Sequence, residues 1–353
     1  MSEETKKIVF LSGTRADFGK IKSLIQKLEN HKDFNPFVFV TGMHLIETYG
    51  YTLIEIERCK FSNVHAFKNH TSEATMDLTL AKTIEGFSNY VKKIQPNLIV
   101  VHGDRVEAMA GAIVGALNNI LVAHIEGGEL SGTVDELIRH SVSKMSHIHY
   151  VSNKNSIKVI GSPDIDIMFS SNLPTLDEVK KYYEIPFNNY ALAMFHPVTT
   201  EYSKIEEYAR NFVDALLKDD KNYEKIIKAY NKLKNNSRFR IFPSIRFEYF
   251  LSLLKNSNFI VGNSSAGIRE APYYGIPTIN IGSRQENRSL HSHMTHVSYK
   301  SDDIFEALKS NHKSIEKDHK TFGIGNSSQL FLESLLEKSI WTLNTQKNFV
   351  DIH

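Results

Sequence analysis

Short apolar runs rich in β-branched and aromatic residues alternate with amphipathic helical stretches along most of the chain, and this alternation restricts its fold more than any other feature. In the first half, apolar runs typical of buried strands occupy residues 7–12, 36–41, 97–102, 120–125 and 147–152. Helical spacing of apolar residues is found at 20–30, 76–93 and 106–117. Strands that alternate with helices predict a parallel sheet covered by helices on both faces.

The same alternation continues after residue 186. The expected strands are 190–195, 239–242, 259–262 and 278–281, and the expected helices are 205–217, 223–233, 247–255, 266–274, 304–308 and 329–343. We therefore expect an α/β protein with two Rossmann-type doubly wound domains, residues 1–165 and 166–330, and a C-terminal helix in 331–353 that packs back on the first domain. In such proteins the ligand binds at the carboxyl ends of the strands, here in the cleft between the domains.

Two connections are shorter than this topology requires. Only residues 153–156 separate the strand at 147–152 from an apolar run at 157–160, whereas a parallel crossover needs roughly a dozen residues. Either these two strands pair as a hairpin, or residues are missing between them. Likewise, the helix at 205–217 runs into the helix at 223–233 with no strand between them.

Composition narrows the functional class. A chain of 353 residues with 41% hydrophobic and 23% charged residues suits a globular protein of two domains. The 42 basic and 40 acidic residues nearly cancel, which disfavours nucleic acid as a partner but leaves room for a local anion site. The single cysteine, Cys59, excludes an internal disulfide and a multi-cysteine zinc site. No signal peptide or bilayer-spanning run is present, so we expect a cytoplasmic protein.

Acidic residues follow the apolar runs in the stretch from residue 101 to 140. Asp104 lies in HGDR, Glu126 in HIEGGE and Asp135 in SGTVDE. A carboxylate just beyond a buried strand is unfavourable unless it is solvated, paired or used. Carboxylates that share one cleft raise one another's pKa, as general acid–base catalysis near neutral pH requires. The three acids are therefore candidate catalytic residues.

Each acid also has a purely structural interpretation. Asp104 would cap the following helix or pair with Arg105, and Glu126 would face solvent beside two glycines. Asp135 would be a favourable first-turn acid in a capping box that begins at Thr133. Each alternative is plausible alone, but the convergence of three acids on one edge of the sheet favours function.

Two motifs are typical of anion sites. GTRADFG, expected to be a loop at residues 13–19, is neither a dinucleotide fingerprint nor a Walker loop, but Arg15 in it can bind a phosphate with two hydrogen bonds or pair with Asp17. In GNSSAGIREAP, Ser264 and Ser265 precede a helix and are suited either to a diphosphate or to ordinary N-capping. Glu270 in the same helix either accepts from ribose hydroxyls or pairs with a neighbouring arginine.

His196 and the FPSIR segment follow expected strands of the second domain. His196, in FHPVTTE, is either a phosphate donor or acid–base group in the cleft, or a structural histidine. Residues 242–246, which include Ser244, form a candidate wall for a base or ring.

Taken together, these motifs resemble those of the hydrolysing UDP-N-acetylglucosamine 2-epimerases, in particular the type found in bacterial sialic-acid (capsule) biosynthesis. The matching strings, which span nearly the whole chain, are GTRADFG, VTGMHL, HGDR, HIEGGELSGTVDE, GSPDID, MFHPVTTE, FPSIRFEYF, GNSSAGIREAP and GSRQ. The resemblance implies a GT-B-like fold and conversion of UDP-N-acetylglucosamine and water to N-acetylmannosamine and UDP. It also implies a homodimer or homotetramer, with no cofactor and no metal.

The resemblance assigns roles to individual residues. In the family's reaction a base removes the proton at sugar C2 while UDP leaves from C1, and water and a proton then add to the 2-acetamidoglucal. Asp104, Glu126, Asp135 and His196 match positions of the proton-transfer machinery. The positions implied for UDP-sugar binding are Arg15, Ala16, Arg105, His196, Ser244, Ser264, Ser265, Glu270 and Arg284. Alternatives are a UDP-2,4-diacetamido-trideoxyhexose as substrate, a GT-B glycosyltransferase, and a nucleotide-sugar sensor without catalysis.

Overall fold

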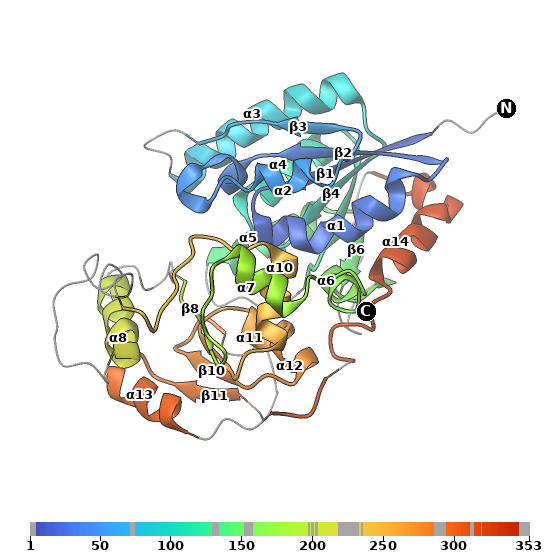
Figure 1. The fold of residues 1–353 in the computed structure, drawn as a ribbon. Helices are drawn as coiled ribbons and strands as arrows, with labels where there is room; N and C mark the ends of the chain where they lie inside the picture. The colour runs from blue at the N-terminus through green and yellow to red at the C-terminus, as the bar shows by residue number, and fades with distance from the viewer. Residues whose placement is uncertain are drawn as a thin grey trace, which may run out of the picture. The chain divides into compact units, whose positions relative to one another are not determined.

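The computed structural model describes most of the chain in two compact units. The described residues are 5–70, 75–128, 134–151, 158–196, 198, 201, 204–217, 233, 236–285, 294–310, 314–318 and 320–345. The first unit comprises residues 1–129, 135–170 and 320–353, and the second comprises 130–134 and 171–319. The chain therefore leaves the first unit near residue 170 and returns to it near residue 320 (Figure 1).

The first unit is built on a seven-stranded sheet in the order β3-β2-β1-β4-β5-β6-β7. Every described strand pair in it is parallel. The strands are β1 (Lys6–Ser12), β2 (Phe34–Val40), β3 (Val64–Ala66), β4 (Leu98–His102), β5 (Leu121–Ile125), β6 (Ile148–Val151) and β7 (Lys158–Val159). The strand order reverses between β1 and β4, which defines the topological switch point where α/β proteins bind ligands.

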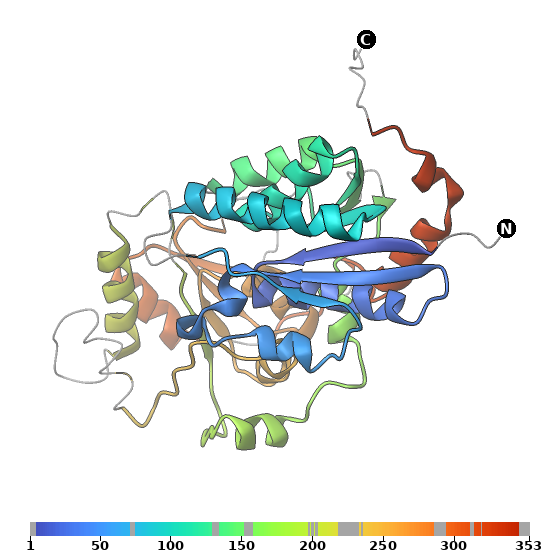
Figure 2. The same ribbon diagram turned by 90° about the horizontal axis from the view of Figure 1, so that it is seen from above.

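Alternating side chains of β1 explain the two apolar layers of this unit. Ile8 and Phe10 face one layer, and Val9 and Leu11 face the other. Figure 2 shows α3 on one side of β1 and β2 and α1 on the other. The helical elements are α1 (Arg15–Glu29), η1 (Gly42–Leu45), η2 (Glu47–Tyr49), α2 (Leu53–Glu57), α3 (Met76–Ile94), α4 (Val106–Leu117), α5 (Val134–Met145), α6 (Pro163–Met168), α14 (Ser327–Leu336) and η4 (Lys338–Thr342).

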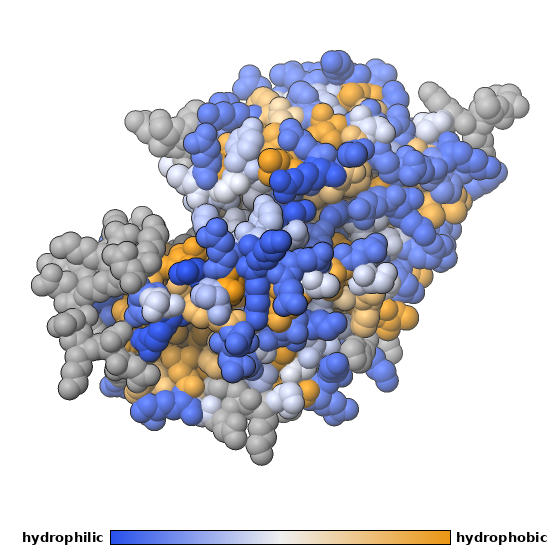
Figure 3. Space-filling model, in the orientation of Figure 1, coloured by the Kyte–Doolittle hydropathy of each residue, from blue (hydrophilic) through white to orange (hydrophobic). Residues whose placement is uncertain are grey.

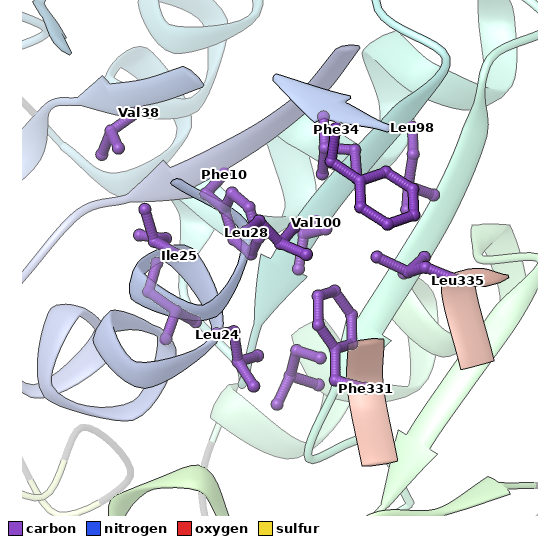
Figure 4. Packing of buried hydrophobic residues seen from close by; sticks show 14 of the residues in the cluster. Phe10, Leu24, Ile25, Leu28, Phe34, Val38, Leu98, Val100, Phe331 and Leu335 are labelled. Carbon is purple, nitrogen blue, oxygen red and sulfur yellow. The ribbon is translucent and has the colours of Figure 1, made fainter. Parts of the chain in front are cut away.

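Helix α14 belongs to the core of this unit, although it lies near the end of the chain. Its Phe331 is fully buried, with ring centroids 6.2 Å from Phe10 and 5.1 Å from Tyr150. Leu335 joins the same cluster, and Figure 4 shows both side chains directed toward residues of α1 and the sheet. The last described α-helix thus completes the layer that begins with the first strand.

The second unit has a four-stranded parallel sheet in the order β11-β10-β9-β8. Its strands are β8 (Leu192–Met194), β9 (Ile260–Gly262), β10 (Thr278–Ile281) and β11 (Met294–Val297). Its helices are α7 (Leu176–Tyr182), α8 (Ile205–Leu217), α10 (Phe247–Lys255), α11 (Ala266–Arg269), α12 (Ala271–Tyr274) and α13 (Ser301–Lys309). Phe212 of α8 and Ile304 of α13 pack with Val261 and Ile279 of the sheet.

Several expectations about local structure are wrong. The helix expected at 329–343 ends at Leu336, and a separate 3-10 helix follows Glu337. GTRADFG is not a loop, because Thr14 caps α1 by accepting from the Asp17 N–H, so the helix begins at Arg15. Residues 239–242 do not form a strand; they are partly or largely exposed and pair with none of the described strands. The helix expected at 266–274 is interrupted at Glu270, which precedes Ala271 and Pro272 of α12.

The short connection after β6 does not form a hairpin. β6 and β7 pair in parallel, with Tyr150 opposite Lys158, so the hairpin interpretation is wrong. Residues 152–157 between them lie outside the described residues, as does the expected helix at 223–233 apart from Leu233.

Hydrophilic side chains cover much of the face shown in Figure 3, and hydrophobic side chains appear there in separate groups. Among the described residues, no helix is both long and apolar enough to cross a membrane.

Candidate active site

Polar side chains of the first unit gather at the carboxyl ends of β1, β4 and β5, around the switch point. His102 is the last residue of β4, and Glu126 follows β5 directly. Asp17 lies in the first turn of α1, which follows β1. Parallel strands end at the same edge of the sheet, so these three side chains meet although they are far apart in sequence.

His102 lies between two carboxylates. Its Nδ1 atom is 3.3 Å from Asp17 Oδ1, and its Nε2 atom is 3.1 Å from Glu126 Oε2. Burial opposes the charged imidazolium, but hydrogen bonds to both carboxylates and their negative charges outweigh it and raise the pKa of His102 to about 9. For Asp17, burial likewise opposes ionisation, yet the hydrogen bond and charge of His102 lower the pKa of its carboxyl.

Glu126 is buried and has an unusual backbone. Only 4% of the residue is exposed, so the interpretation that it faces solvent is wrong. Its φ of 59° lies in the left-handed region, which costs a non-glycine residue on the order of 1–3 kcal/mol. Its N–H donates to the Tyr150 carbonyl at 2.8 Å, and its Oε1 atom accepts from the Ser162 hydroxyl. These bonds fix the carboxylate in place.

Arg139 of α5 connects the two acids that were expected from the HGDR and HIEGGE motifs. Its Nη1 donates to the Glu126 carbonyl oxygen at 2.5 Å, and its Nη2 forms an ion pair with Asp104 Oδ2. Asp104 therefore pairs with Arg139, whereas Arg105 pairs with Glu107 at 3.3 Å. Arg105 is the N-cap residue of α4, and its side chain makes no capping hydrogen bond.

Asp135 lies four residues before Arg139 on α5, so the two side chains project from the same face of that helix. Thr133, the first residue of its expected capping box, lies outside the described residues.

A lysine reaches the same group from α1. Lys20 is 9% exposed, pairs with Asp164 Oδ2, and its Nζ lies 4.0 Å from Glu126 Oε1. The Ser162 hydroxyl joins Glu126 to Asp164. Two carboxylates thus share one buried ammonium group and one hydroxyl.

Arg15 and Ala16 form the first helical turn of α1, beside these groups in sequence. Arg15 is partly buried and Ala16 is exposed. Beneath the preceding turn, the Glu107 carboxylate fills the space next to Gly13, where an added Cβ would lie 2.7 Å from Glu107 Cδ. The turn after β1 is therefore packed against a buried acid from α4.

In the second unit, Asn263 organises the region after β9. Its Oδ1 accepts from the His196 N–H at 2.7 Å, and its Nδ2 donates to the His196 carbonyl at 2.8 Å. Its own carbonyl accepts from Arg284 Nη1 at 3.0 Å and Gln285 Nε2 at 2.9 Å. Burial and then the charge of Arg284 lower the pKa of His196 to about 4, so its imidazole is neutral at pH 7.

The remaining expected residues of this unit are Ser264, Ser265 and Glu270, which follow β9, and Ser244. Ser265 is the N-cap residue of α11, but its side chain makes no capping hydrogen bond, and the Ser264 hydroxyl accepts from the Ala266 N–H at 3.3 Å. Glu270 is buried between α11 and α12, and Ser244 lies in the segment before α10. His196, Ser264 and Arg284 are thus associated through Asn263 and its neighbours.

Sequence reasoning missed several members of these groups. His102, Lys20, Asp17 and Arg139 were not among the expected site residues, and neither was Asn263. The HGDR motif carried a signal for His102, because this residue ends an expected strand two residues before an expected catalytic acid. In the described part of the chain, no group of three His, Cys, Asp or Glu side chains is arranged to hold a metal ion.

The fold and these residues define a two-domain α/β protein with a buried carboxylate cluster at the switch point of its first sheet. The family model described as UDP-N-acetylglucosamine 2-epimerase matches residues 26–336. A UDP-N-acetylglucosamine 2-epimerase of Neisseria meningitidis is 44% identical over 99% of this chain and 100% of its own length. A UDP-N,N'-diacetylbacillosamine 2-epimerase (hydrolyzing) of Legionella pneumophila is 30% identical over 86% of this chain and 88% of its own length.

Among solved structures, the UDP-GlcNAc 2-epimerase of Neisseria meningitidis bound to UDP-GlcNAc aligns with a TM-score of 0.79 at 16% identity, covering 94% of this chain and 100% of that one. This likeness confirms the expected GT-B-like fold class. The chain belongs to the UDP-N-acetylglucosamine 2-epimerase family. Its alignment with the 44% identical relative spans 377 positions, more than the 353 residues of the chain, so some positions of the relative have no counterpart here.

Proposed function

We propose that this protein is a hydrolysing 2-epimerase that converts UDP-N-acetylglucosamine and water to N-acetylmannosamine and UDP. The observation that carries the proposal is Arg139, which binds both Asp104 and the backbone of Glu126 and so holds two motif acids at one site. The 44% identity to a UDP-N-acetylglucosamine 2-epimerase supports the choice of substrate. A role in supplying N-acetylmannosamine for sialic acid and capsule synthesis follows as part of the same proposal.

The reaction suits a group of buried carboxylates. A base removes the proton from sugar C2 as the C1–O bond to UDP breaks, which gives 2-acetamidoglucal. Water then adds at C1, and a proton returns to C2 on the opposite face. Proton transfers on two faces need more than one acid–base group, and we assign them to Asp104, Glu126 and Asp135.

Release of UDP requires stabilisation of a diphosphate. We assign this to Arg15 and Arg105 of the first unit and to His196, Ser264, Ser265 and Arg284 of the second, with Ala16, Ser244 and Glu270 contacting the nucleotide. Cationic side chains and backbone N–H groups at helix starts stabilise a leaving anion electrostatically. Because His196 is neutral at pH 7, it can donate one hydrogen bond to phosphate without carrying a charge.

Proton NMR of the reaction in heavy water tests the proposal. We expect UDP-N-acetylglucosamine to yield N-acetylmannosamine that carries deuterium at C2, together with UDP, without any sugar acceptor. Product without label at C2 would contradict elimination and re-addition. A requirement for an acceptor would indicate a glycosyltransferase, and UDP binding without product would indicate a sensor.

The 30% identity to a diacetylbacillosamine 2-epimerase supports one alternative substrate, a UDP-2,4-diacetamido-trideoxyhexose. The two UDP-sugars should be compared at equal concentration. We expect the larger kcat/KM for UDP-N-acetylglucosamine, and a reversed preference would replace our assignment with the alternative.

A further inference from the structure

His102 is a buried imidazole that is neither one of the motif acids nor one of the expected UDP-binding residues. Its side chain is 10% exposed, and each ring nitrogen faces a carboxylate oxygen, Asp17 Oδ1 on one side and Glu126 Oε2 on the other. An ionised carboxylate only accepts hydrogen bonds. Two such partners are therefore satisfied together only when both ring nitrogens carry a proton, which makes the ring an imidazolium.

We propose that His102 is a positioning residue that, as an imidazolium held by Asp17, fixes the orientation and the ionised form of the Glu126 carboxylate. The inference rests on the proposed function, in which Glu126 takes part in proton transfer at the sugar. His102 donates to Oε2, and Oε1 contacts the Ser162 hydroxyl, whose single proton is shared between Glu126 and Asp164. Contacts at both oxygens restrict rotation of the carboxylate. A fixed carboxylate has a defined direction for exchanging a proton with substrate.

The charges around His102 favour this state. Asp17 comes from α1 and Glu126 from the end of β5, and both are negative. The nearby cations interact with the carboxylates. Lys20 Nζ lies 4.0 Å from Glu126 Oε1, and the positive charge of Arg105 lowers the pKa of Asp17. His124 on the neighbouring strand β5 is neutral at pH 7, because burial lowers its pKa to about 3. His102, with a pKa of about 9, is therefore charged throughout the neutral range.

Two substitutions separate the roles of the two ring nitrogens. In His102→Gln the amide nitrogen approximates Nε2 and keeps a donor toward Glu126, whereas in His102→Asn it approximates Nδ1 and keeps a donor toward Asp17. We expect kcat to fall about 10-fold in His102→Gln and about 100-fold in His102→Asn, since the lost hydrogen bond joins charged groups. KM should stay within about twofold of wild type, because His102 does not bind substrate. His140→Gln, a change at an exposed histidine of α5, is the matched control.

The pH profile provides a readout that a purely structural role would not change. Wild-type kcat should fall as pH rises through about 9, where His102 loses its proton. This fall should be absent in His102→Gln, because the amide does not titrate. The acid limb of this variant should move to higher pH, because the imidazolium no longer favours the carboxylate form of Glu126 and only Lys20 remains as a nearby cation. Equal losses in both variants, with the wild-type pH profile retained, would overturn the proposal.

A second measurement needs no turnover. In wild-type protein with ¹⁵N-labelled histidine, the resonances of His102 are identified as those missing in His102→Gln. We expect them to titrate near pH 9 in wild type and at clearly lower pH in Glu126→Gln. A wild-type transition at or below the ordinary value of about 6.5 would overturn the proposal. If the wild type releases no UDP, the proposed function fails, and this titration still decides the state of His102.

Discussion

His124 donates a hydrogen bond from Nε2 to the backbone carbonyl oxygen of Gly103, with an N···O distance of 2.8 Å. A carbonyl only accepts, so Nε2 carries the proton and Nδ1 accepts from the Ser143 hydroxyl at 3.0 Å. A neutral histidine on β5 thus fixes the turn that leads to Asp104. On the neighbouring strand, His102 is charged. Adjacent strands therefore hold two histidines in different protonation states.

The stability of the first unit should depend on pH with a maximum near pH 6.5. Burial lowers the pKa of His44 to about 4 and that of His124 to about 3. Below pH 6.5 the unfolded chain binds protons at these histidines that the folded protein does not, so the free energy of unfolding decreases. Above pH 6.5 the unfolded chain loses the proton that folded His102 keeps up to about pH 9, so the free energy decreases again.

The single tryptophan, Trp341, packs against the core of this unit and reports its unfolding by fluorescence. The urea midpoint should be measured at pH steps from 5 to 9.5. His102→Gln should flatten the decrease above pH 6.5 and leave the lower side unchanged. A wild-type midpoint that keeps rising to pH 9 would contradict the assignment of charge to His102.

Arg139→Lys should reduce kcat strongly with a small change in KM. A lysine ammonium cannot bind the Asp104 carboxylate and the Glu126 carbonyl in the geometry of the guanidinium fork. We expect kcat to fall on the order of 100-fold, since misplacement of a reacting group by about 1 Å costs this much. UDP release at saturating substrate is the measurement, and Arg58→Lys on the exposed surface is the control. Equal activity of the two variants would show that Arg139 does not position the acids.

Asn263→Asp should weaken UDP binding and destabilise the second unit. The substitution replaces the amide group that donates to the His196 carbonyl with an oxygen, so two acceptors face each other in a site where Asn263 is fully buried. An unsatisfied buried group costs roughly 1–3 kcal/mol, which corresponds to a loss of about 5-fold to 150-fold in affinity for UDP, measured by calorimetry. Asn258→Asp, at an exposed position before β9, is the control and should bind UDP normally. Unchanged UDP affinity in Asn263→Asp would contradict the proposal that His196, held by Asn263, binds the diphosphate.

Phe331→Ala should destabilise the first unit by about 3–5 kcal/mol, as expected when a buried aromatic ring leaves a cavity. The ring packs against Phe10 of β1 and Tyr150 of β6. Leu336→Ala on the same helix is the control, because Leu336 is 48% exposed and its truncation should change stability by less than about 0.5 kcal/mol. Urea unfolding followed by Trp341 fluorescence measures both. Similar midpoints for the two variants would show that α14 is not part of the core.

Local periodicity predicted much of the secondary structure. The helices at 106–117, 205–217 and 247–255 and the strand at 278–281 agree with the structure at both ends. These segments are determined by their own apolar spacing. GTRADFG was misassigned because the cap at Thr14 starts a helix among residues that also suit a loop. Residues 239–242 were misassigned because an apolar run forms a strand only where a partner strand is available.

The candidate site was predicted in part, because acids that follow strands are visible in the sequence but their partners are not. Asp104 and Glu126 were identified in this way. Asp17 is 85 residues from His102, and Lys20 is 144 residues from Asp164. Which residues meet in such pairs depends on the order of the strands in the sheet. Local sequence patterns do not reveal this order. The same reason explains why Arg139 and Asn263 were missed.

The position of α14 has a consequence for how the protein is made. Phe331 and Leu335 complete the apolar layer between α1 and the first sheet. A nascent chain leaving the ribosome therefore exposes this layer until residue 336 has been translated, long after β1 to β7 have been synthesised. The first unit can complete its core only after the whole of the second unit has also been synthesised. A translation product that stops between them would contain every acid and still lack a closed core.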